Sequence, residues 1–285
     1  MSTPTRPILR YFGGKWRLAP WIISHFPPHN VYVEPFCGAA SVFFRKPHAK
    51  FGSVLNDING EIVNLFLVLR DLKLSEELLR LLRLTPFARD ELVLARIDDV
   101  NITPVERARR LIVRSQLGRG SCLLRDNTGF RGRRTNSTYP AVDWMNYPDA
   151  LTETIKHLQG ITIENLQAGE ILKRYDGGDV LFYVDPPYPH CTRRHRDDYA
   201  ECEMSNDKHR ILAQALHSVS GMVVLSGYRC DLMDELYADW ERKERQVCND
   251  GQKKCIECIW LSSYTKRRLE DSKMETSLFC QPALS

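Results

Sequence analysis

The stretch "VLFYVDPPYPH" at residues 180–190 constrains the fold more than any other part of the chain. Its first residues are apolar and fit a strand buried inside a sheet. Two adjacent prolines end a ladder of hydrogen bonds, because neither of them carries an N–H group. The pattern therefore predicts a buried strand that stops at Asp185 and continues as a stiff, exposed turn. In open α/β sheets, ligands bind beyond the carboxyl ends of the strands, so this turn is a candidate site.

Strands and helices alternate on both sides of this stretch. Strands are expected at 31–36, 53–57, 161–166, 180–185, 221–228, 241–248 and 255–263, and helices at 60–72, 168–176, 205–219 and 230–240. Such alternation predicts an α/β fold with a mostly parallel sheet covered on both faces. The last two strands flank a short polar turn, "NDGQKK", and are expected to form an antiparallel terminal hairpin.

A helical and basic block interrupts the alternation. The pattern is purely helical from about residue 74 to 116, and one helix begins clearly, with Thr103 as cap, Pro104 in the first turn and Glu106 completing a capping box. Residues 118–139 are polar and glycine-punctuated, which is typical of a loop or hairpin. The chain is therefore expected to divide into an α/β part at 1–73, an inserted domain at 74–147 and a second α/β part at 148–285.

The positive charge of the chain is concentrated in one segment. The net charge is +4, and residues 118–140 contain five arginines and one acid, so the remainder is neutral. A local basic excess on a neutral protein indicates a polyanionic partner. An arginine-rich loop exposed to solvent, without a partner, would give the same pattern, and charge alone does not separate the two.

The cysteines and the N-terminus indicate a protein of the cytoplasm. There are nine cysteines, and the chain begins without a signal peptide or an apolar run long enough to span a membrane. An odd number of cysteines without a secretion signal is typical of free thiols. Cys255 and Cys258 are spaced as in zinc sites, but on a strand they would face opposite sides, and a second such pair is missing. No metal is expected.

Two further stretches place residues suited to ligand binding at the ends of predicted strands. "EPFCGAAS" at 34–41 places small residues where a ligand can approach the backbone, although a tight turn would look the same. "LNDIN" places Asp57 where a carboxylate can accept both hydroxyls of a ribose. In the proline turn, Asp185 and the Pro186 carbonyl are rigid acceptors, and Tyr188 offers a stacking face. The order of these stretches is far more specific than any one of them.

Together these stretches resemble the DNA N6-adenine methyltransferases of the Dam-like, or alpha, group of phages and prophages, which use S-adenosylmethionine. "RYFGGKWRLAPWI" is similar to their N-terminal cofactor motif and "YVEPFCGAASVFF" to their methionine-binding turn. "LNDING" is similar to their ribose-binding stretch and "LFYVDPPY" to their catalytic motif. The resemblance covers nearly the whole chain. It implies a Rossmann-like methyltransferase sheet with an inserted, mainly helical DNA-recognition domain.

The resemblance also assigns residues to roles. Two positions depart from the family's pattern, because Ala40 stands where a second glycine is frequent and Gln167 where an acid often contacts the cofactor's adenine. A glutamine can donate and accept, so it can still meet an adenine edge. The implied catalytic residues are Asp185, Pro186, Pro187 and Tyr188. The implied cofactor-binding residues are Tyr11, Gly13, Gly14, Lys15, Glu34, Pro35, Phe36, Gly38, Ala39, Ser41, Asp57, Ile58, Gln167 and Asp185. The expected DNA contacts are Arg119, Arg125, Arg131, Arg133, Arg134 and Asn136.

The residue types suggest how such an enzyme would work. The exocyclic amine of adenine is a poor nucleophile, since its lone pair is delocalised into the ring. Asp185 and the Pro186 carbonyl can each accept one N–H and direct the lone pair at the methyl group of the cofactor. A base in duplex DNA must first be flipped out, and Tyr188 would then stack on it. The expected partner is double-stranded DNA, and the expected state a monomer or a transient dimer on DNA.

Two alternatives remain open from the sequence. A methyltransferase acting on RNA or on a protein amide would share the cofactor turn, although those relatives more often carry asparagine in place of Asp185. A DNA-binding relative that has lost catalysis would share the fold, and Ala40 and Gln167 are the positions that keep this alternative open.

Overall fold

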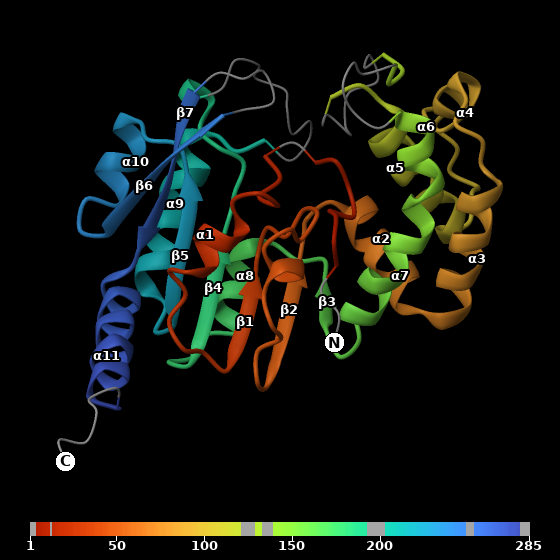
Figure 1. Ribbon diagram of the computed structural model, residues 1–285. Helices are drawn as coiled ribbons and strands as arrows, with labels where there is room; N and C mark the ends of the chain where they lie inside the picture. The colour runs from red at the N-terminus through yellow and green to blue at the C-terminus, as the bar shows by residue number, and fades with distance from the viewer. Residues whose placement is uncertain are drawn as a thin grey trace.

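The computed structural model describes residues 4–11, 13–120, 129–132, 139–192, 203–248 and 254–279. Its centre is a seven-stranded sheet in the order β3-β2-β1-β4-β5-β7-β6 (Figure 1). Strands β1 to β5 are parallel, and β7 runs antiparallel to both of its neighbours. This confirms the predicted α/β fold and its antiparallel end. The strands are β1 (Val31–Glu34), β2 (Gly52–Asn56), β3 (Thr162–Glu164), β4 (Val180–Val184), β5 (Met222–Gly227), β6 (Glu241–Cys248) and β7 (Lys254–Leu261).

Helices cover both faces of the sheet. Alternate residues of a strand face opposite sides, so Val33 and Phe182 join one core and Tyr32 and Leu181 the other. The first core is closed by α8 (Ala168–Arg174), α9 (Asn206–Ser218) and α10 (Asp231–Leu236). The second is closed by α1 (Ala19–Ile23), α2 (Gly60–Arg70) and part of α11 (Ser263–Phe279).

The second core continues without a break into a group of helices beside the β3 edge of the sheet (Figure 1). Leu78, Leu111 and Trp144 from this group are buried in the same cluster as Tyr32. The helices therefore share a core with the sheet face instead of enclosing a core of their own. They are α3 (Leu72–Leu84), α4 (Arg89–Leu94), α5 (Pro104–Leu117), α6 (Pro140–Met145) and α7 (Tyr147–His157).

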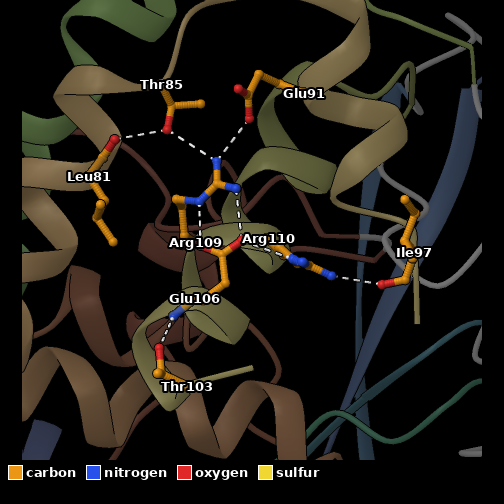
Figure 2. Close-up of polar contacts among 8 residues, drawn as sticks. All are labelled: Leu81, Thr85, Glu91, Ile97, Thr103, Glu106, Arg109 and Arg110. Carbon is orange, nitrogen blue, oxygen red and sulfur yellow. Dashed lines mark hydrogen bonds and ion pairs between the residues drawn. The ribbon is translucent and has the colours of Figure 1, made fainter. Parts of the chain in front are cut away.

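Arg109 on α5 holds three of these helices together through one guanidinium group (Figure 2). Its Nε and Nη2 donate to the two carboxylate oxygens of Glu106 at 2.6 and 2.8 Å. Its Nη1 donates to Glu91 of α4 at 3.0 Å and to the Thr85 hydroxyl at the end of α3 at 3.1 Å. Hydrogen bonding from Arg109 lowers the pKa of Glu106. The predicted Thr103 cap is present, since Thr103 Oγ1 accepts from Glu106 N at 3.2 Å. The predicted capping box is not completed, because the Glu106 carboxylate accepts from Arg109 and Arg110.

Some predicted boundaries were wrong. Helices α6 and α7 were not predicted. Pro140 and Pro148 each occupy the first turn of a helix, where no N–H is needed. Helix α10 ends at Leu236, earlier than expected. Helix α11 was missed because its sequence is strongly charged, and its first turn is fixed by Thr265, whose hydroxyl bonds both the N–H and the carbonyl of Val223. Within the described residues, no helix is both long and apolar enough to cross a bilayer.

Replacing Arg109 should weaken the helical group. The change Arg109→Ala removes a guanidinium that is 13% exposed, leaves the Glu91 carboxylate unpaired and leaves Glu106 paired with Arg110 alone. We expect the free energy of unfolding to fall by about 2 kcal/mol. Arg83→Ala is the matched control, since Arg83 pairs with Asp149 on the surface and such pairs contribute at most about 1 kcal/mol. Urea denaturation followed by circular dichroism measures both, and equal losses would contradict the role given to Arg109.

Candidate active site

A cavity opens at the carboxyl ends of β1, β2 and β4. The space between its walls is about 700 Å³ when the solvent at its open mouth is included, and the room that water-sized molecules can occupy is about 80 Å³. All predicted cofactor residues except Pro35 and Gln167 line it. The structure adds Cys37, Val42 and Tyr183, which the sequence did not single out. The lining residues are Tyr11, Gly13, Gly14, Lys15, Glu34, Phe36, Cys37, Gly38, Ala39, Ser41, Val42, Asp57, Ile58, Tyr183, Asp185 and Pro187.

The turn after β1 forms one wall of the cavity and contains two residues in the left-handed region. Gly38 has φ +47°, and a Cβ at this position would meet Tyr11 Cε1 at 3.0 Å. Ala40 has φ +48° and is fully buried. A left-handed conformation costs an L-residue about 1–2 kcal/mol. The alanine therefore keeps the backbone that a second glycine would adopt without strain.

Asp57 fixes this turn to the end of β2. Its Oδ2 accepts from Gly38 N at 2.8 Å, and its Oδ1 accepts from Asn59 N at 2.9 Å. Burial raises the pKa of Asp57 above its ordinary value, and the two N–H donors oppose the shift. Each carboxylate oxygen has a second lone pair, so these bonds leave capacity for hydroxyl donors from the cavity. Contact with a ribose remains a prediction.

Asn56, which the sequence did not single out, ties three turns together. Its Nδ2 donates to the carbonyls of Pro35 and Leu166 at 2.8 and 3.0 Å, and its Oδ1 accepts from Leu166 N at 2.8 Å. Pro35 thus helps to fix the turn after β1 and does not itself line the cavity. Gln167 is exposed at the start of α8 and does not line the cavity.

Glu34 is a buried acid that holds the far side of the same turn. Its Oε1 accepts from the Tyr32 hydroxyl at 2.7 Å and from Phe43 N at 2.9 Å. Burial raises the pKa of Glu34 to about 8, and the two donors act against that shift. Glu34 is therefore largely protonated at neutral pH, and it orients the segment from the turn to Phe43.

The turn after β4 is buried, so the prediction of an exposed turn was wrong. Pro186 and Pro187 are buried, Tyr188 is 5% exposed, and the Asp185 side chain is 20% exposed. The cover comes from the N-terminal segment, because Lys15 places its Nζ 3.1 Å from Asp185 Oδ1. Burial raises the pKa of Asp185, and the charge of Lys15 opposes that shift.

Lys15 also meets a second carboxylate that the sequence did not reveal. Its Nζ lies 3.5 Å from Glu257 Oε1 on β7, donates to Gly13 O at 2.7 Å and stands 4.8 Å from the centre of the Tyr188 ring. The same Glu257 Oε1 accepts from the Tyr188 hydroxyl at 2.5 Å. The sequence feature that could have identified Glu257 is its position as an acid inside the apolar run "CIECIWL". Lys15, Asp185, Tyr188 and Glu257 thus form one buried polar cluster.

Of the predicted DNA-contact residues, the structure describes Arg119 and Arg131. Arg119 is exposed just beyond α5. Arg131 is engaged within the fold, because its Nη2 lies 2.9 Å from Asp143 Oδ2. Backbone bonds from Arg119 N to Gly129 O and from Arg131 N to Leu117 O join the two ends of the loop. The remaining members lie outside the described residues, namely Arg125, Arg133, Arg134 and Asn136.

The two cysteines of the CxxC spacing have different surroundings. Cys258 is fully buried in the core that contains Trp260, whereas Cys255 is half-buried, with its sulfur 3.9 Å from the Tyr228 hydroxyl. In the described part of the chain, no group of three or more potential metal ligands occurs.

The cavity lies at the switch between β1 and β4, with an acid at the end of each neighbouring strand, and this is the position where doubly wound α/β proteins bind their ligands. The sequence profile of the D12 class N6 adenine-specific DNA methyltransferases matches residues 11–249. The chain therefore belongs to this family, and the predicted adenine-specific DNA methyltransferase is confirmed at that level.

Individual relatives agree with this assignment. The chain is 22% identical over 260 residues to the type II methyltransferase M.CviBI of Paramecium bursaria Chlorella virus NC1A, covering 87% of this chain and 94% of the viral protein. It is 27% identical over 257 residues to the type II methyltransferase M1.LlaDCHI of Lactococcus lactis subsp. cremoris, covering 82% and 85%. A shorter match, 39% over 66 residues, covers 23% of this chain and 22% of the DNA adenine methylase of Haemophilus influenzae.

The two left-handed residues of the turn after β1 give a paired prediction. Gly38→Ala should lower the free energy of unfolding by about 1–2 kcal/mol, since it adds a Cβ at φ +47° against the Tyr11 ring. Ala40→Gly relieves the strain at φ +48° and should cost no more than about 0.5 kcal/mol for the lost methyl group. Thermal and urea denaturation measure both variants. A larger loss in Ala40→Gly than in Gly38→Ala would refute this account of the turn.

Proposed function

We propose that the chain transfers a methyl group from S-adenosylmethionine to the N6 amino group of adenine in double-stranded DNA, releasing S-adenosylhomocysteine. One observation carries the proposal beyond family membership. Asp185 lines the same cavity as the turn at Gly38 and the carboxylate of Asp57. A ligand held by that turn would therefore present its reactive end to the acceptor pair at Asp185 and Pro186.

The lining fits this cofactor chemically. A cradle without a Cβ at Gly38, an acid at Asp57 and the apolar faces of Phe36 and Ile58 suit a backbone-bound amino acid, a ribose and a planar base. The bound cofactor supplies a methyl group activated by a positively charged sulfur. The other residues that would hold it are those predicted from the sequence and lining the cavity, Tyr11, Gly13, Gly14, Lys15, Glu34, Ala39 and Ser41.

The chain's own residues supply orientation. An ionised Asp185 accepts one N–H of the adenine amine, and the Pro186 carbonyl accepts the other, so the lone pair turns toward the methyl group. Lys15 favours the ionised form of Asp185 against the cost of burial. Because both prolines are buried, the acceptors are preorganised and need no rearrangement during the reaction. The target base would be flipped into this site from the duplex, and we assign the stacking contact with it to Tyr188.

Loss of Asp185 should abolish turnover more than it weakens cofactor binding. In Asp185→Ala, we expect methyl transfer to fall at least about 100- to 1000-fold, the usual effect of removing one preorganised hydrogen-bonding group. Transfer of labelled methyl groups to unmethylated duplex DNA measures turnover, and calorimetry measures cofactor affinity. Asp98→Ala, on the surface, is the matched control. Turnover of Asp185→Ala within about threefold of wild type would rule out the two-acceptor mechanism.

DNA recognition is assigned to the arginine-rich loop that follows α5. Arginine suits this task, because its fork pairs with phosphate and with the guanine edge in the major groove. Arg131 is paired with Asp143, so we assign it to the base of the loop. The contacts with DNA then fall to Arg119, Arg125, Arg133, Arg134 and Asn136.

Salt dependence separates these roles. In the triple variant Arg119→Ala, Arg133→Ala, Arg134→Ala, each lost phosphate contact should flatten the plot of log affinity against log salt by about one unit. A lost base contact should instead cost about 1–3 kcal/mol of sequence discrimination. Arg131→Ala should leave the slope unchanged, as should the control Arg210→Ala on α9. If affinity, slope and sequence preference were all unchanged in the triple variant, recognition would lie elsewhere.

A further inference from the structure

We propose that Glu257 is a positioning residue of the methyl-transfer site, which holds the hydroxyl of Tyr188 and shares Lys15 with Asp185. The inference rests on the function proposed above and adds to it a residue that lies outside the cavity. Its role follows from the position of its carboxylate, which contacts the ammonium group of Lys15 and the hydroxyl of Tyr188.

Glu257 is a buried acid on a strand that otherwise has an apolar buried face. It is 3% exposed, and the residues that follow it, Cys258, Ile259 and Trp260, are buried in the two cores. A carboxylate in such a place costs several kcal/mol unless it is paired and hydrogen-bonded. Its cross-strand neighbour Arg245 lies over the Trp21 ring instead. The partners of Glu257 are therefore those of the catalytic cluster.

One ammonium group lies between two carboxylates. Lys15 Nζ is 3.1 Å from Asp185 Oδ1 and 3.5 Å from Glu257 Oε1, and both Lys15 and Glu257 are nearly inaccessible to solvent. If Lys15 faced Asp185 alone, its N–H groups would compete with the adenine amine for the same oxygens. Glu257 on β7 binds the same ammonium group of Lys15, so Asp185 does not take all of its N–H groups. Lys15 favours the ionised form of Asp185, whereas burial and the charge of Glu257 raise the pKa of Asp185. What Glu257 contributes is a second partner for the ammonium group, which leaves Asp185 acceptor capacity toward the cavity.

The Tyr188 ring is held at three places. Its hydroxyl donates to Glu257 Oε1 at 2.5 Å, Lys15 Nζ lies 4.8 Å from its centre, and its ring meets that of Tyr228 edge to face at 4.9 Å. A ring fixed in this way loses little freedom when a base arrives, and such preorganisation favours binding. Without Glu257 the hydroxyl would keep only Asp185 as a buried acceptor, and the ring would lose the contact that holds it toward β7.

Three variants of the full chain test this role: Glu257→Ala, Glu257→Gln and Tyr188→Phe. The kcat is measured on a duplex containing the site that the wild-type enzyme methylates. Flipping is followed separately by fluorescence, on the same duplex with 2-aminopurine in place of the target adenine. In Glu257→Ala we expect kcat to fall about 10- to 100-fold and the fluorescence rise to be lost, with cofactor affinity within about threefold of wild type. Glu244→Ala, an exposed acid on β6, is the matched control and should match wild type.

The conservative variants separate positioning from stability. Glu257→Gln keeps an acceptor for the Tyr188 hydroxyl and should restore most of the fluorescence rise, whereas its kcat should stay below wild type because the charge facing Lys15 is gone. Tyr188→Phe should lose the fluorescence rise, and adding Glu257→Ala to it should remove little more of that signal, since both changes break one contact.

Other results would overturn the proposal. Wild-type kcat and fluorescence in Glu257→Ala would show that the residue does not act on the site. A parallel loss of cofactor affinity, fluorescence and folding in both Glu257 variants would reduce it to a structural residue. An inactive wild-type protein would defeat the proposed function and this inference together, whereas an active wild type with unaltered variants defeats the inference alone.

Discussion

The ammonium group of Lys15 joins the parts of the molecule that make the site. It stands between Asp185 at the end of β4 and Glu257 on β7, and it bonds the backbone of its own glycine turn at Gly13. Three segments far apart in the chain therefore meet at one buried charge. Because an unpaired charge in this place would cost several kcal/mol, each segment is needed where it lies. The buried catalytic turn and the fixed Tyr188 ring are consequences of this contact.

The second support of the site is the backbone of the turn after β1. The Asp57 carboxylate takes the N–H of Gly38, and the Asn56 amide clamps Pro35 to the start of the α8 segment at Leu166. Parallel strands bring their carboxyl ends to one edge of the sheet, so Gly38, Asp57 and the pair of Lys15 and Asp185 line the same cavity. The sheet thus brings the turn at Gly38 and the turn at Asp185 side by side, as the proposed methyl transfer between two bound molecules requires.

Local patterns made the sheet predictable, and long-range contacts limited what could be said of the site. The strand before Asp185 was predictable because an apolar run ends at two prolines, and the gathering of Gly38, Asp57 and Asp185 follows from strand-end positions. The burial of Asp185 could not be predicted, because the side chain that packs over it is Lys15, from the N-terminal segment. Glu257 and the pairing of Arg131 with Asp143 were equally hidden, since each depends on a partner that no local pattern identifies. Helices α6 and α7 were missed because a proline in a first helical turn resembles one in a loop.

The identity of the product tests the central claim most directly, because the arrangement of Asp185, Pro186 and Lys15 is argued to serve an adenine amine. Unmethylated duplex DNA is incubated with the protein and S-adenosylmethionine, digested to nucleosides and analysed by mass spectrometry. The account predicts N6-methyladenosine in its deoxy form as the modified nucleoside. A methylated cytosine, or unmodified DNA in the presence of protein that binds both cofactor and DNA, would contradict it.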